Sequence, residues 1–479
     1  MHHRVTRSPR LAGLDFDDIR AEADVPGPFD AAVLEEAERV AGSPPRTGRD
    51  ATDLPLVTID PPGARDLDQA LAIEARAGGG WRVRYAIADV GAWVTPSGAV
   101  DTAARARTQT YYSPDRNDPL HPPVLGAGAA SLLPDGDRPA ALWTLDVDPD
   151  GLLTDTRVER ATVRSRAQLT YDQVQRAVES GDLPAPLAAL PTLGRALLAD
   201  ARTRGSVELG LPEQEVVPHR SHGWTIALRA TLDVERWNAQ ISLLTGRAAA
   251  RLMLEHRTGL LRTLPAAVPT VLPRLRAAAG GLGITWEPAQ GPGDVLAGLD
   301  LADARHAAFA DLAAELLRGA GYTHLDGTLP DDPGHAGVGA PYAHVTAPLR
   351  RLADRFATEV CLALGQGRAV PDWVLEALPG LPDLMREGDS RARKLDRLAV
   401  DATEAYVLHD RIGEVFPVAV MEAGATGGTV VLDEPAVRAR CDGRDLPLGA
   451  TIDARCVEAD VARRAVRFEW VGGPTVPGR

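Results

Sequence analysis

The sequence is poor in lysine. Lys394 is the only lysine among 479 residues, and every other basic residue is arginine. A phosphate-binding P-loop requires the string GxxxxGK[ST], and protein-kinase motifs also require a lysine, so neither class fits this chain. The heavy use of arginine, alanine, glycine and proline is explained most simply by a compositional bias of the genome.

Cysteines and long apolar runs are also scarce. Cys361, Cys441 and Cys456 are too few and too scattered for a disulfide framework or a zinc site. They are typical of reduced, buried thiols, and a cytoplasmic location is expected. No run of eighteen apolar residues occurs, so no membrane span is expected. The N-terminal string MHHRVTRSPRLAG lacks the apolar core of a signal peptide.

Positive charge is in deficit overall. The net charge is -14 and the sequence pI is about 5.3, which at first argues against a nucleic-acid partner. Net charge, however, describes solubility and long-range steering rather than what a single groove binds. A basic groove inside an acidic protein therefore stays open.

The hydrophobic pattern changes twice along the chain. Residues 11–43 have apolar residues at helical spacing, and a Pro/Gly-containing linker follows over residues 43–53. Period-two alternation then predicts two hairpins, one around Gly78-Gly79-Gly80 and one around Pro149-Asp150-Gly151, before a mainly helical stretch. We predict an α+β domain over residues 51–405, preceded by a small helix-turn-helix-like region over residues 1–50.

The C-terminal region reads differently from the rest. Residues 406–479 contain about five short strands broken by turn residues, which favours a small OB-fold barrel. Another small β domain, such as a dimerisation module, is the alternative. We expect the chain to be a monomer.

A cluster of aspartates is the first candidate site. The string TIDPPGARDLDQAL places Asp60 at the end of a strand, before a Pro-Pro-Gly turn, and Asp66 and Asp68 two residues apart. In an extended segment the last two point to the same side. Carboxylates without histidine or cysteine suit a hard cation such as Mg²⁺ or Mn²⁺, which also takes ligands from substrate phosphates. A solvated acidic loop is the alternative reading of this string alone.

An arginine motif is the second candidate. In HAGVGAPYAHVTAPLRRLADRFATEVCLAL, residues 335–364, the pattern predicts a helix that begins near Thr346 with Pro348 in its first turn. Arg350 and Arg351 would then lie in the first turn, where cations oppose the helix dipole unless an anion binds there. Solvated surface arginines are the alternative.

Together the two strings resemble the RNase II (RNB) family of exoribonucleases. The family pattern has an aspartate, five residues and D-x-D-D-A, followed further on by T-S-P-I-R-[RK]-Y-x-D. Asp60, Asp66, Asp68 and the string HVTAPLRRLAD match it. The segment TYYSPDRNDPLHPPVLGAGAASLLPDGDRPA and the string YDQV at residues 171–174 match in order between them. The resemblance covers roughly residues 54–405, and the family also has a C-terminal OB-fold that binds RNA.

The resemblance implies roles for individual residues. Asp60 and Asp66 would be metal ligands, and Asp68 would be the ligand most essential for catalysis. Arg350 would contact the scissile phosphate, with Arg351 beside it at the substrate. The remaining substrate-contacting positions would be Tyr112, Tyr171 and Gln240, the last by a weaker match to a glutamate of relatives.

The sequence departs from the family in two ways. Gln69 stands where the fourth aspartate is expected; its carbonyl oxygen could coordinate a cation, but it brings no charge. About fifty residues with helical pattern stand where relatives carry cold-shock domains that funnel RNA. The RNA path is therefore expected to be more open, which would admit structured or double-stranded RNA.

The activity implied by the resemblance is hydrolytic 3′→5′ exoribonuclease action with magnesium, releasing nucleoside 5′-monophosphates. Two rivals remain open. One is a catalytically impaired RNA-binding protein that keeps the fold, which Gln69 motivates. The other is a metal-dependent phosphodiesterase that acts on DNA or small nucleotides.

Overall fold

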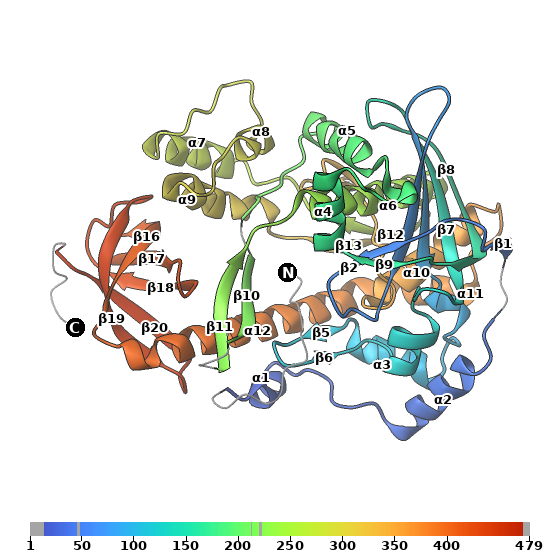
Figure 1. Ribbon diagram of the computed structural model, residues 1–479, viewed down its shortest axis with the longest axis horizontal. Helices are drawn as coiled ribbons and strands as arrows, with labels where there is room; N and C mark the ends of the chain where they lie inside the picture. The colour runs from blue at the N-terminus through green and yellow to red at the C-terminus, as the bar shows by residue number, and fades with distance from the viewer. Residues whose placement is uncertain (1–13, 46–47, 212, 220–222, 473–479) are drawn as a thin grey trace.

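The computed structural model describes residues 14–45, 48–211, 213–219 and 223–472. A five-stranded sheet with its helices lies at one end of the molecule and a small barrel at the other, and a long helix runs between them (Figure 1). Residues 1–13, which form the string MHHRVTRSPRLAG and include the start of the predicted N-terminal helical region, lie outside the described residues.

The main sheet contains both predicted hairpins. Its strand order is β1-β8-β7-β4-β3, with all neighbours antiparallel except the parallel pair β1 and β8. The strands β3–β4 form the hairpin around Gly78-Gly79-Gly80, and β7–β8 form the hairpin around Pro149-Asp150-Gly151, as predicted. The bounds are β1 Arg49–Ala51, β3 Gln69–Ala75, β4 Trp81–Ala88, β7 Asp137–Val147 and β8 Leu153–Arg164.

Strand β1 lies inside the segment predicted as a linker. It pairs with the edge of β8, with Ala51 opposite Val163. Ala51 is fully buried, so the pairing secures the segment to the sheet. A strand of three residues is too short to show period-two alternation, so no local pattern predicts it.

The two faces of the main sheet carry different helices. On β4, Val83, Tyr85 and Ile87 belong to one core with α5, α6 and α10, whereas Ala86 and Ala88 belong to a second core with α2 and α3. Period-two alternation thus buries both faces of the sheet between helices. The helices are α2 Ala31–Ala41, α3 Ala99–Arg107, α4 Tyr171–Ser180, α5 Leu190–Thr203, α6 Asp233–His256, α7 Val271–Gly281, α8 Pro292–Ala297, α9 Ala304–Ala313, α10 Leu352–Leu364, α11 Asp372–Ala377 and α12 Leu381–Leu408.

Short strand pairs and single turns of helix complete this part. The pairs are β2 Thr58–Asp60 with β9 Gln168–Thr170, β5 Tyr111–Tyr112 with β6 Asn117–Asp118, β10 Glu213–His219 with β11 Gly223–Arg229, β12 Thr258–Thr263 with β13 Gly321–Asp326, and β14 Gly334–His335 with β15 Ala340–Pro341. The single turns are η1 Val90–Ala92, η2 Leu125–Ala129, η3 Ala185–Leu187, η4 Ala314–Leu317, η5 Leu378–Gly380 and η6 His409–Arg411.

The C-terminal region is a closed five-stranded barrel, which confirms the OB-fold prediction. Its order is β16-β17-β18-β20-β19, with β18 and β20 parallel and the other neighbours antiparallel. Phe416 and Phe468 meet edge to face in its core at 6.0 Å between ring centroids. The strands are β16 Val415–Gly424, β17 Gly427–Leu432, β18 Val437–Asp442, β19 Thr451–Asp460 and β20 Ala465–Trp470. The predicted boundary after residue 405 lies within α12.

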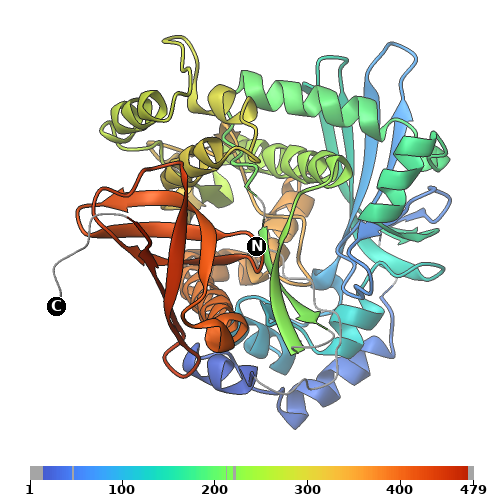
Figure 2. The ribbon, with the colours of Figure 1, turned by 60° about the vertical axis from the view of Figure 1, so that its left-hand side comes forward.

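The barrel is fastened to the rest of the chain at Glu404 of α12. The Glu404 carboxylate accepts hydrogen bonds from the Arg438 backbone N–H of the barrel at 2.7 Å and from Gln214 Nε2 of β10 at 3.1 Å. The guanidinium of Arg438 also forms two hydrogen bonds to Asp311 of α9, at 2.7 and 2.8 Å. The hairpin β10–β11 lies between the barrel and the main sheet with its helices (Figure 2). One buried carboxylate therefore joins three elements.

Burial raises the pKa of Glu404 from 4.5 to about 7, against the hydrogen bonds that lower it. The folded state thus favours the neutral acid. Its stabilising contribution is full below about pH 4.5 and is lost as the pH rises towards 7, by up to about 3 kcal/mol. We expect Glu404→Gln to become more stable relative to the wild type between pH 5 and 8. Urea unfolding across that range measures the difference, and parallel curves would contradict it.

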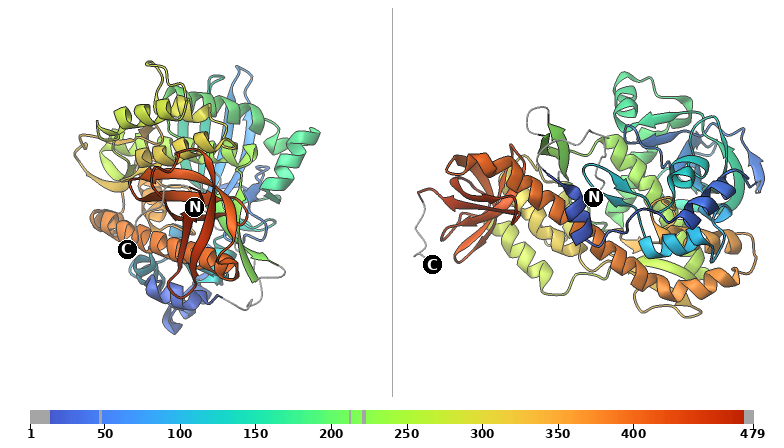
Figure 3. Two further views of the ribbon diagram at one scale, coloured as in Figure 1. Left: turned by 90° about the vertical axis from the view of Figure 1, so that its left-hand side faces the viewer. Right: turned by 90° about the horizontal axis from the view of Figure 1, so that it is seen from below.

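The two N-terminal helices pack against different neighbours. The helix α1, Phe16–Glu22, lies across α12 (Figure 3, right). Its Phe16 also meets Trp224 of β11 edge to face, with 5.4 Å between the ring centroids. The helix α2 packs against α3 and η2. The helix-turn-helix-like interpretation of residues 1–50 stays a prediction, because only part of that region is described.

Two expectations about composition can be compared with the structure. No helix in the described ranges is long and apolar enough to cross a membrane. Cys361, Cys441 and Cys456 are free and buried.

Candidate active site

Asp60 is fixed where the chain leaves strand β2. The strand pairs with β9, with Asp60 opposite Thr170. Gly63 then takes a φ of +80°, which glycine adopts without a Cβ penalty. The Gln168 Nε2 group of β9 donates to the Ala64 carbonyl at 2.8 Å and holds the far side of the turn. The predicted Pro-Pro-Gly turn is therefore braced by the neighbouring strand.

Asp66 and Asp68 flank a fully buried leucine. Leu67 is 0% exposed and belongs to the core on one face of the main sheet. Its N–H donates to Ser131 Oγ at 2.9 Å, which fixes the segment before β3 begins. Because alternate residues of an extended segment point to opposite sides, Asp66 and Asp68 both point away from that core.

The predicted start of the arginine helix is wrong. The helix α10 begins at Leu352 with Arg351 as its N-cap residue, and residues 348–350 form a turn before it. Arg351 is extended, with φ -142° and ψ 121°, and bridges Gln109. The carboxylate of Asp354 accepts the Ala347 N–H at 2.7 Å, so it secures a loop rather than a helical turn. Arg350 therefore lies in a loop.

This loop brings Arg350 to Asp68. The Nε atom of Arg350 lies 3.4 Å from Asp68 Oδ2, and the Leu349 N–H donates to Asp68 Oδ1 at 2.8 Å. Asp68 is 3% exposed, whereas the Arg350 side chain is 28% exposed. Asp68 of the aspartate motif and Arg350 of the arginine motif thus form one site. Arg350 lies on the side of this site that is open to solvent.

Arg351 points elsewhere. Its guanidinium forms hydrogen bonds to both oxygens of Asp354, at 2.5 and 2.9 Å. Asp354 is fully buried. The structure thus gives Arg351 an internal partner, and its assignment to substrate binding stays a prediction.

Both predicted tyrosines lie close to the acidic cluster. Burial raises the pKa of Tyr112, and the charges of Arg350 and Asp66 act on the same phenol. Burial also raises the pKa of Tyr171, together with the charge of Asp60, to about 12. Tyr171 follows Thr170, which lies opposite Asp60, so strand register alone places it there.

Asn238 is a site residue that the sequence did not reveal. Its Nδ2 group donates to the Tyr171 hydroxyl at 3.3 Å from α6. Its Oδ1 atom is buried without a hydrogen-bond partner among the described residues. Gln240 is half-buried on the same helix, two residues further on. A single asparagine in a helical sequence pattern does not indicate a functional site. The contact between Asn238 and Tyr171 becomes visible only when α6 packs against α4.

Burial dominates the electrostatics of the aspartates. It raises the pKa of Asp60 to about 7 and that of Asp66 in the same direction. Burial raises the pKa of Asp68 well above its usual range, while Arg350 and the Leu349 N–H act against it. Three carboxyl groups held this way favour the arrival of positive charge.

The residues present fit a hard divalent cation. Within the described ranges, no three side chains of His, Cys, Asp or Glu are grouped so that they could hold a metal ion by themselves. Mg²⁺ in proteins, however, commonly takes one or two carboxylates and completes its shell with water and substrate phosphates. The Oδ2 atom of Asp60 is buried without a hydrogen-bond partner in the described part of the chain. A cation shared between these aspartates and a phosphate would satisfy it.

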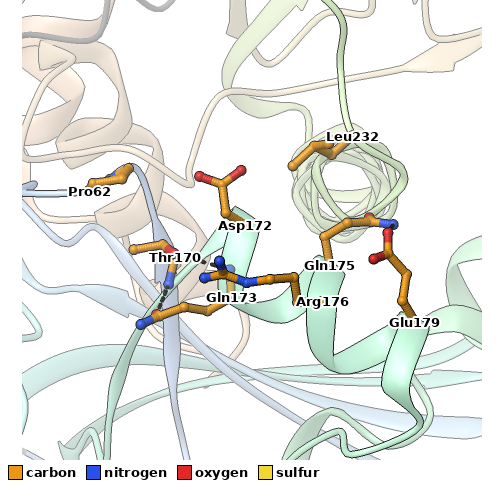
Figure 4. Close-up of a pocket in the computed structure, with 8 residues that line it drawn as sticks. All are labelled: Pro62, Thr170, Asp172, Gln173, Gln175, Arg176, Glu179 and Leu232. Carbon is orange, nitrogen blue, oxygen red and sulfur yellow. Dashed lines mark hydrogen bonds between the residues drawn. The ribbon is translucent and has the colours of Figure 1, made fainter.

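A pocket of about 450 Å³ opens beside the turn that follows Asp60. Pro62 lies on one side, one face of α4 forms the floor, and Leu232 before α6 lies opposite (Figure 4). The Asp172 carboxylate points into this space. None of the predicted site residues lines it, so it is a surface pocket next to the acidic cluster and not the cluster itself.

The hairpin that carries Tyr112 is held by the N-terminal helix. The side chain of Arg20 in α1 is 4% exposed and forms two hydrogen bonds to Asp115 in the β5–β6 turn, at 2.6 and 3.0 Å. We expect Arg20→Met to lower the free energy of unfolding by about 2 kcal/mol, because hydrogen bonds between charged groups are lost while Asp115, whose side chain is 32% exposed, regains contact with water.

Arg116→Met is the matched control for that prediction. The Arg116 side chain is 50% exposed, and its ion pairs to Asp17 and Asp118 span 2.9 and 3.5 Å. The Arg116→Met variant should lose less than about 1 kcal/mol of the free energy of unfolding. Urea denaturation compares the two variants, and equal losses would contradict the role given to Arg20.

Comparison with known proteins agrees with this arrangement. The model of the RNB domain matches residues 48–361, and that of the RNase II-type exonuclease C-terminal S1 domain matches residues 414–471. The chain belongs to the RNB family. This family's motif positions are those that the structure brings together at Asp68 and Arg350.

Several RNB relatives are similar over most of this chain. Ribonuclease R of Escherichia coli (strain K12) is 28% identical over 417 residues, which cover 81% of this chain and 50% of that protein. Ribonuclease R of Aquifex aeolicus (strain VF5) is 26% identical over 508 residues, covering 98% and 72%. The chain thus spans about half the length of the Escherichia coli relative.

Solved structures show the same fold. Mycoplasma genitalium RNase R in complex with ribose methylated single-stranded RNA has a TM-score of 0.84 at 20% identity, covering 95% of this chain and 77% of that chain. The same enzyme in complex with double-stranded RNA has a TM-score of 0.81 at 21% identity, covering 95% and 82%. Yeast Ssd1, described as a pseudonuclease, has a TM-score of 0.66 at 18% identity, covering 93% and 54%.

Proposed function

We propose that this chain is a hydrolytic 3′→5′ exoribonuclease that degrades RNA to nucleoside 5′-monophosphates with Mg²⁺ or Mn²⁺. The observation that carries the proposal is the contact of Arg350 and the Leu349 N–H with Asp68, beside Asp60 and Asp66. A cation-binding cluster and a guanidinium on its open side are what phosphodiester hydrolysis requires.

Each residue has a distinct task in this proposal. Asp60 and Asp66, with Asp68, hold the cation, which when bound neutralises phosphate charge and lowers the pKa of water. Arg350 donates to the scissile phosphate and stabilises the charge that develops on its oxygens. Tyr112 and Tyr171 stack on or pack against the terminal bases, which suits sequence-independent binding. Gln240 contacts the terminal nucleotide from α6.

A side-by-side digestion tests the substrate class. Single-stranded RNA and DNA of one sequence are incubated with the protein and Mg²⁺, with EDTA added in a parallel series. We expect mononucleotides from RNA only, and none with EDTA. Digestion of DNA at an equal rate would favour the phosphodiesterase alternative.

Structured RNA is the finer part of the proposal. One of the structures with a similar fold is a complex with double-stranded RNA. We therefore expect a duplex with a 3′ overhang to be degraded past the junction. Complete arrest at the first base pair would refute this part and leave single-strand activity untouched.

A catalytically impaired RNA-binding protein remains the second candidate. Gln69 in place of an aspartate favours it, and the fold is also similar to a pseudonuclease. The presence of Asp60, Asp66, Asp68 and Arg350 favours an active enzyme. RNA binding without any release of mononucleotides would support the impaired protein.

Some expectations concern the whole molecule. We infer that residues 1–50, 51–405 and 406–479 act as a helical region, a catalytic domain and an RNA-binding barrel. We also expect a monomer in the cytoplasm. Size-exclusion chromatography with light scattering tests the first part of that expectation, and a stable dimer would contradict it.

A further inference from the structure

Gln69 makes a contact that a family aspartate could not make. It is the first residue of β3, where it pairs with Ile87, and its side-chain Nε2 group donates to the backbone carbonyl of Thr346. Thr346 is buried and lies 277 residues further along the chain. The bond therefore joins the acidic segment to the loop that carries Arg350.

Both backbone and side-chain hydrogen bonds shape that loop. The N–H groups of Arg350 and Arg351 donate to the Ala347 carbonyl at 3.2 and 2.9 Å, and side chains bond to other backbone groups of residues 346–349. The Ala347 N–H is bonded to Asp354 and the Leu349 N–H to Asp68. Gln69 provides the hydrogen-bond donor for the Thr346 carbonyl. Two neighbouring residues, Asp68 and Gln69, thus hold the loop on either side of Pro348.

Hydrogen-bond chemistry separates glutamine from aspartate at this position. A carboxamide has two N–H donors, whereas an ionised carboxylate only accepts. A carboxylate next to the Thr346 carbonyl would repel it and leave a buried acceptor without a hydrogen-bond donor. Aspartate is also one methylene shorter than glutamine. The amide is therefore matched to this loop.

We propose that Gln69 is a positioning residue that holds the loop of residues 346–351 so that Arg350 faces Asp68, and that the cation is left to the aspartates together with water and the RNA phosphate. The inference rests on the proposed nuclease function. It explains why the active site can lack the fourth carboxylate of the family pattern. The side chain at position 69 orients Arg350 through the loop and does not bind the metal.

Three substitutions separate this role from that of a metal ligand. Gln69→Glu keeps the length and the oxygen but loses the donor, Gln69→Met keeps the shape without polarity, and Gln69→Asp restores the family pattern. We expect each to lower kcat about tenfold with KM for RNA and Mn²⁺ affinity within twofold. Restoring the family residue should thus weaken the enzyme.

Hydrogen exchange by mass spectrometry gives a readout without RNA or metal. The peptide that contains residues 345–352 should exchange at least tenfold faster in Gln69→Glu and Gln69→Met than in the wild type. Gln168→Met is the matched control, because Gln168 Nε2 donates to the Ala64 carbonyl at 2.8 Å. It should accelerate exchange around residue 64 and leave residues 345–352 unchanged.

The outcomes are distinct. Unchanged exchange of residues 345–352 in both Gln69 variants would overturn the proposal. A Gln69→Glu or Gln69→Asp enzyme with unchanged or higher kcat and tighter Mn²⁺ binding would also overturn the proposal. The side chain at this position would then contact the metal through an oxygen. A wild-type protein that releases no mononucleotides would refute the proposed function but would leave the exchange result standing.

Discussion

Asp68→Asn is expected to abolish RNA hydrolysis while the protein still folds and binds RNA. Asparagine keeps an oxygen that can accept the Leu349 N–H, so the loop contact survives. The change removes the negative charge that the cation and Arg350 both need. We expect kcat to fall at least about 10³-fold. Release of mononucleotides from radiolabelled RNA measures the loss, and filter binding in EDTA measures affinity.

Asp148→Asn is the matched control for this variant. Asp148 lies in the β7–β8 turn, where its Oδ1 accepts the N–H groups of Asp150 and Leu152 at 3.0 and 2.9 Å. It should keep the wild-type rate within about twofold, because an exposed turn contributes nothing to the site. Full activity in Asp68→Asn would refute the central role of Asp68.

Arg350→Met is expected to produce the second largest loss of activity. The Arg350 side chain is partly open to solvent, and its nearest charged partner is Asp68. Removing it takes away the donor that would stabilise charge on the scissile phosphate, so kcat should fall about 10²–10³-fold. The free energy of unfolding should fall less than in Arg351→Met, because the contact with Asp68 is a single approach of 3.4 Å and Asp68 keeps the hydrogen bond from the Leu349 N–H.

Arg351→Met should show the reverse pattern. Its guanidinium pairs with Asp354, which is fully buried, so the variant leaves a buried carboxylate without its charged partner. We expect a loss of about 3–5 kcal/mol of stability. Single-turnover kinetics and urea unfolding on both variants give the comparison. A large loss of stability in Arg350→Met with normal kcat would contradict the division of roles.

Elements with a local signal could be predicted from sequence. Gly78-Gly79-Gly80 and Pro149-Asp150-Gly151 marked both hairpins, because turn residues and period-two alternation are local properties. The barrel was predictable for the same reason. The convergence of Asp68 with Arg350 was not local, since 282 positions separate them; family resemblance predicted it and the structure places them 3.4 Å apart.

Features that depend on distant partners were missed. The arginine helix was expected to start near Thr346, but a contact between Ala347 and Asp354 and a bridge between Arg351 and Gln109 delay it to Leu352. The capping pattern alone could not show this, because long-range contacts override local preference. Strand β1 was read as a linker because its pairing partner is more than a hundred residues away.

The role of Gln69 illustrates a further limit. In the sequence it is only a missing aspartate, which suggested a weaker metal site or an impaired protein. In the structure its amide has a partner, the Thr346 carbonyl, that no motif predicts. Which atoms of a side chain are used is decided by tertiary packing, and a motif position shows only which atoms are available.

The most direct test of the central claim is a product ladder from a 5′-labelled, single-stranded RNA with Mg²⁺. If the aspartate and arginine site is a 3′→5′ exoribonuclease, the labelled strand shortens one nucleotide at a time from its 3′ end. In a parallel digest of uniformly labelled RNA, the released products run with nucleoside 5′-monophosphates, and neither signal appears with Asp68→Asn. Immediate release of the labelled 5′ nucleotide, internal fragments without a ladder, or no cleavage by the wild type would contradict the account.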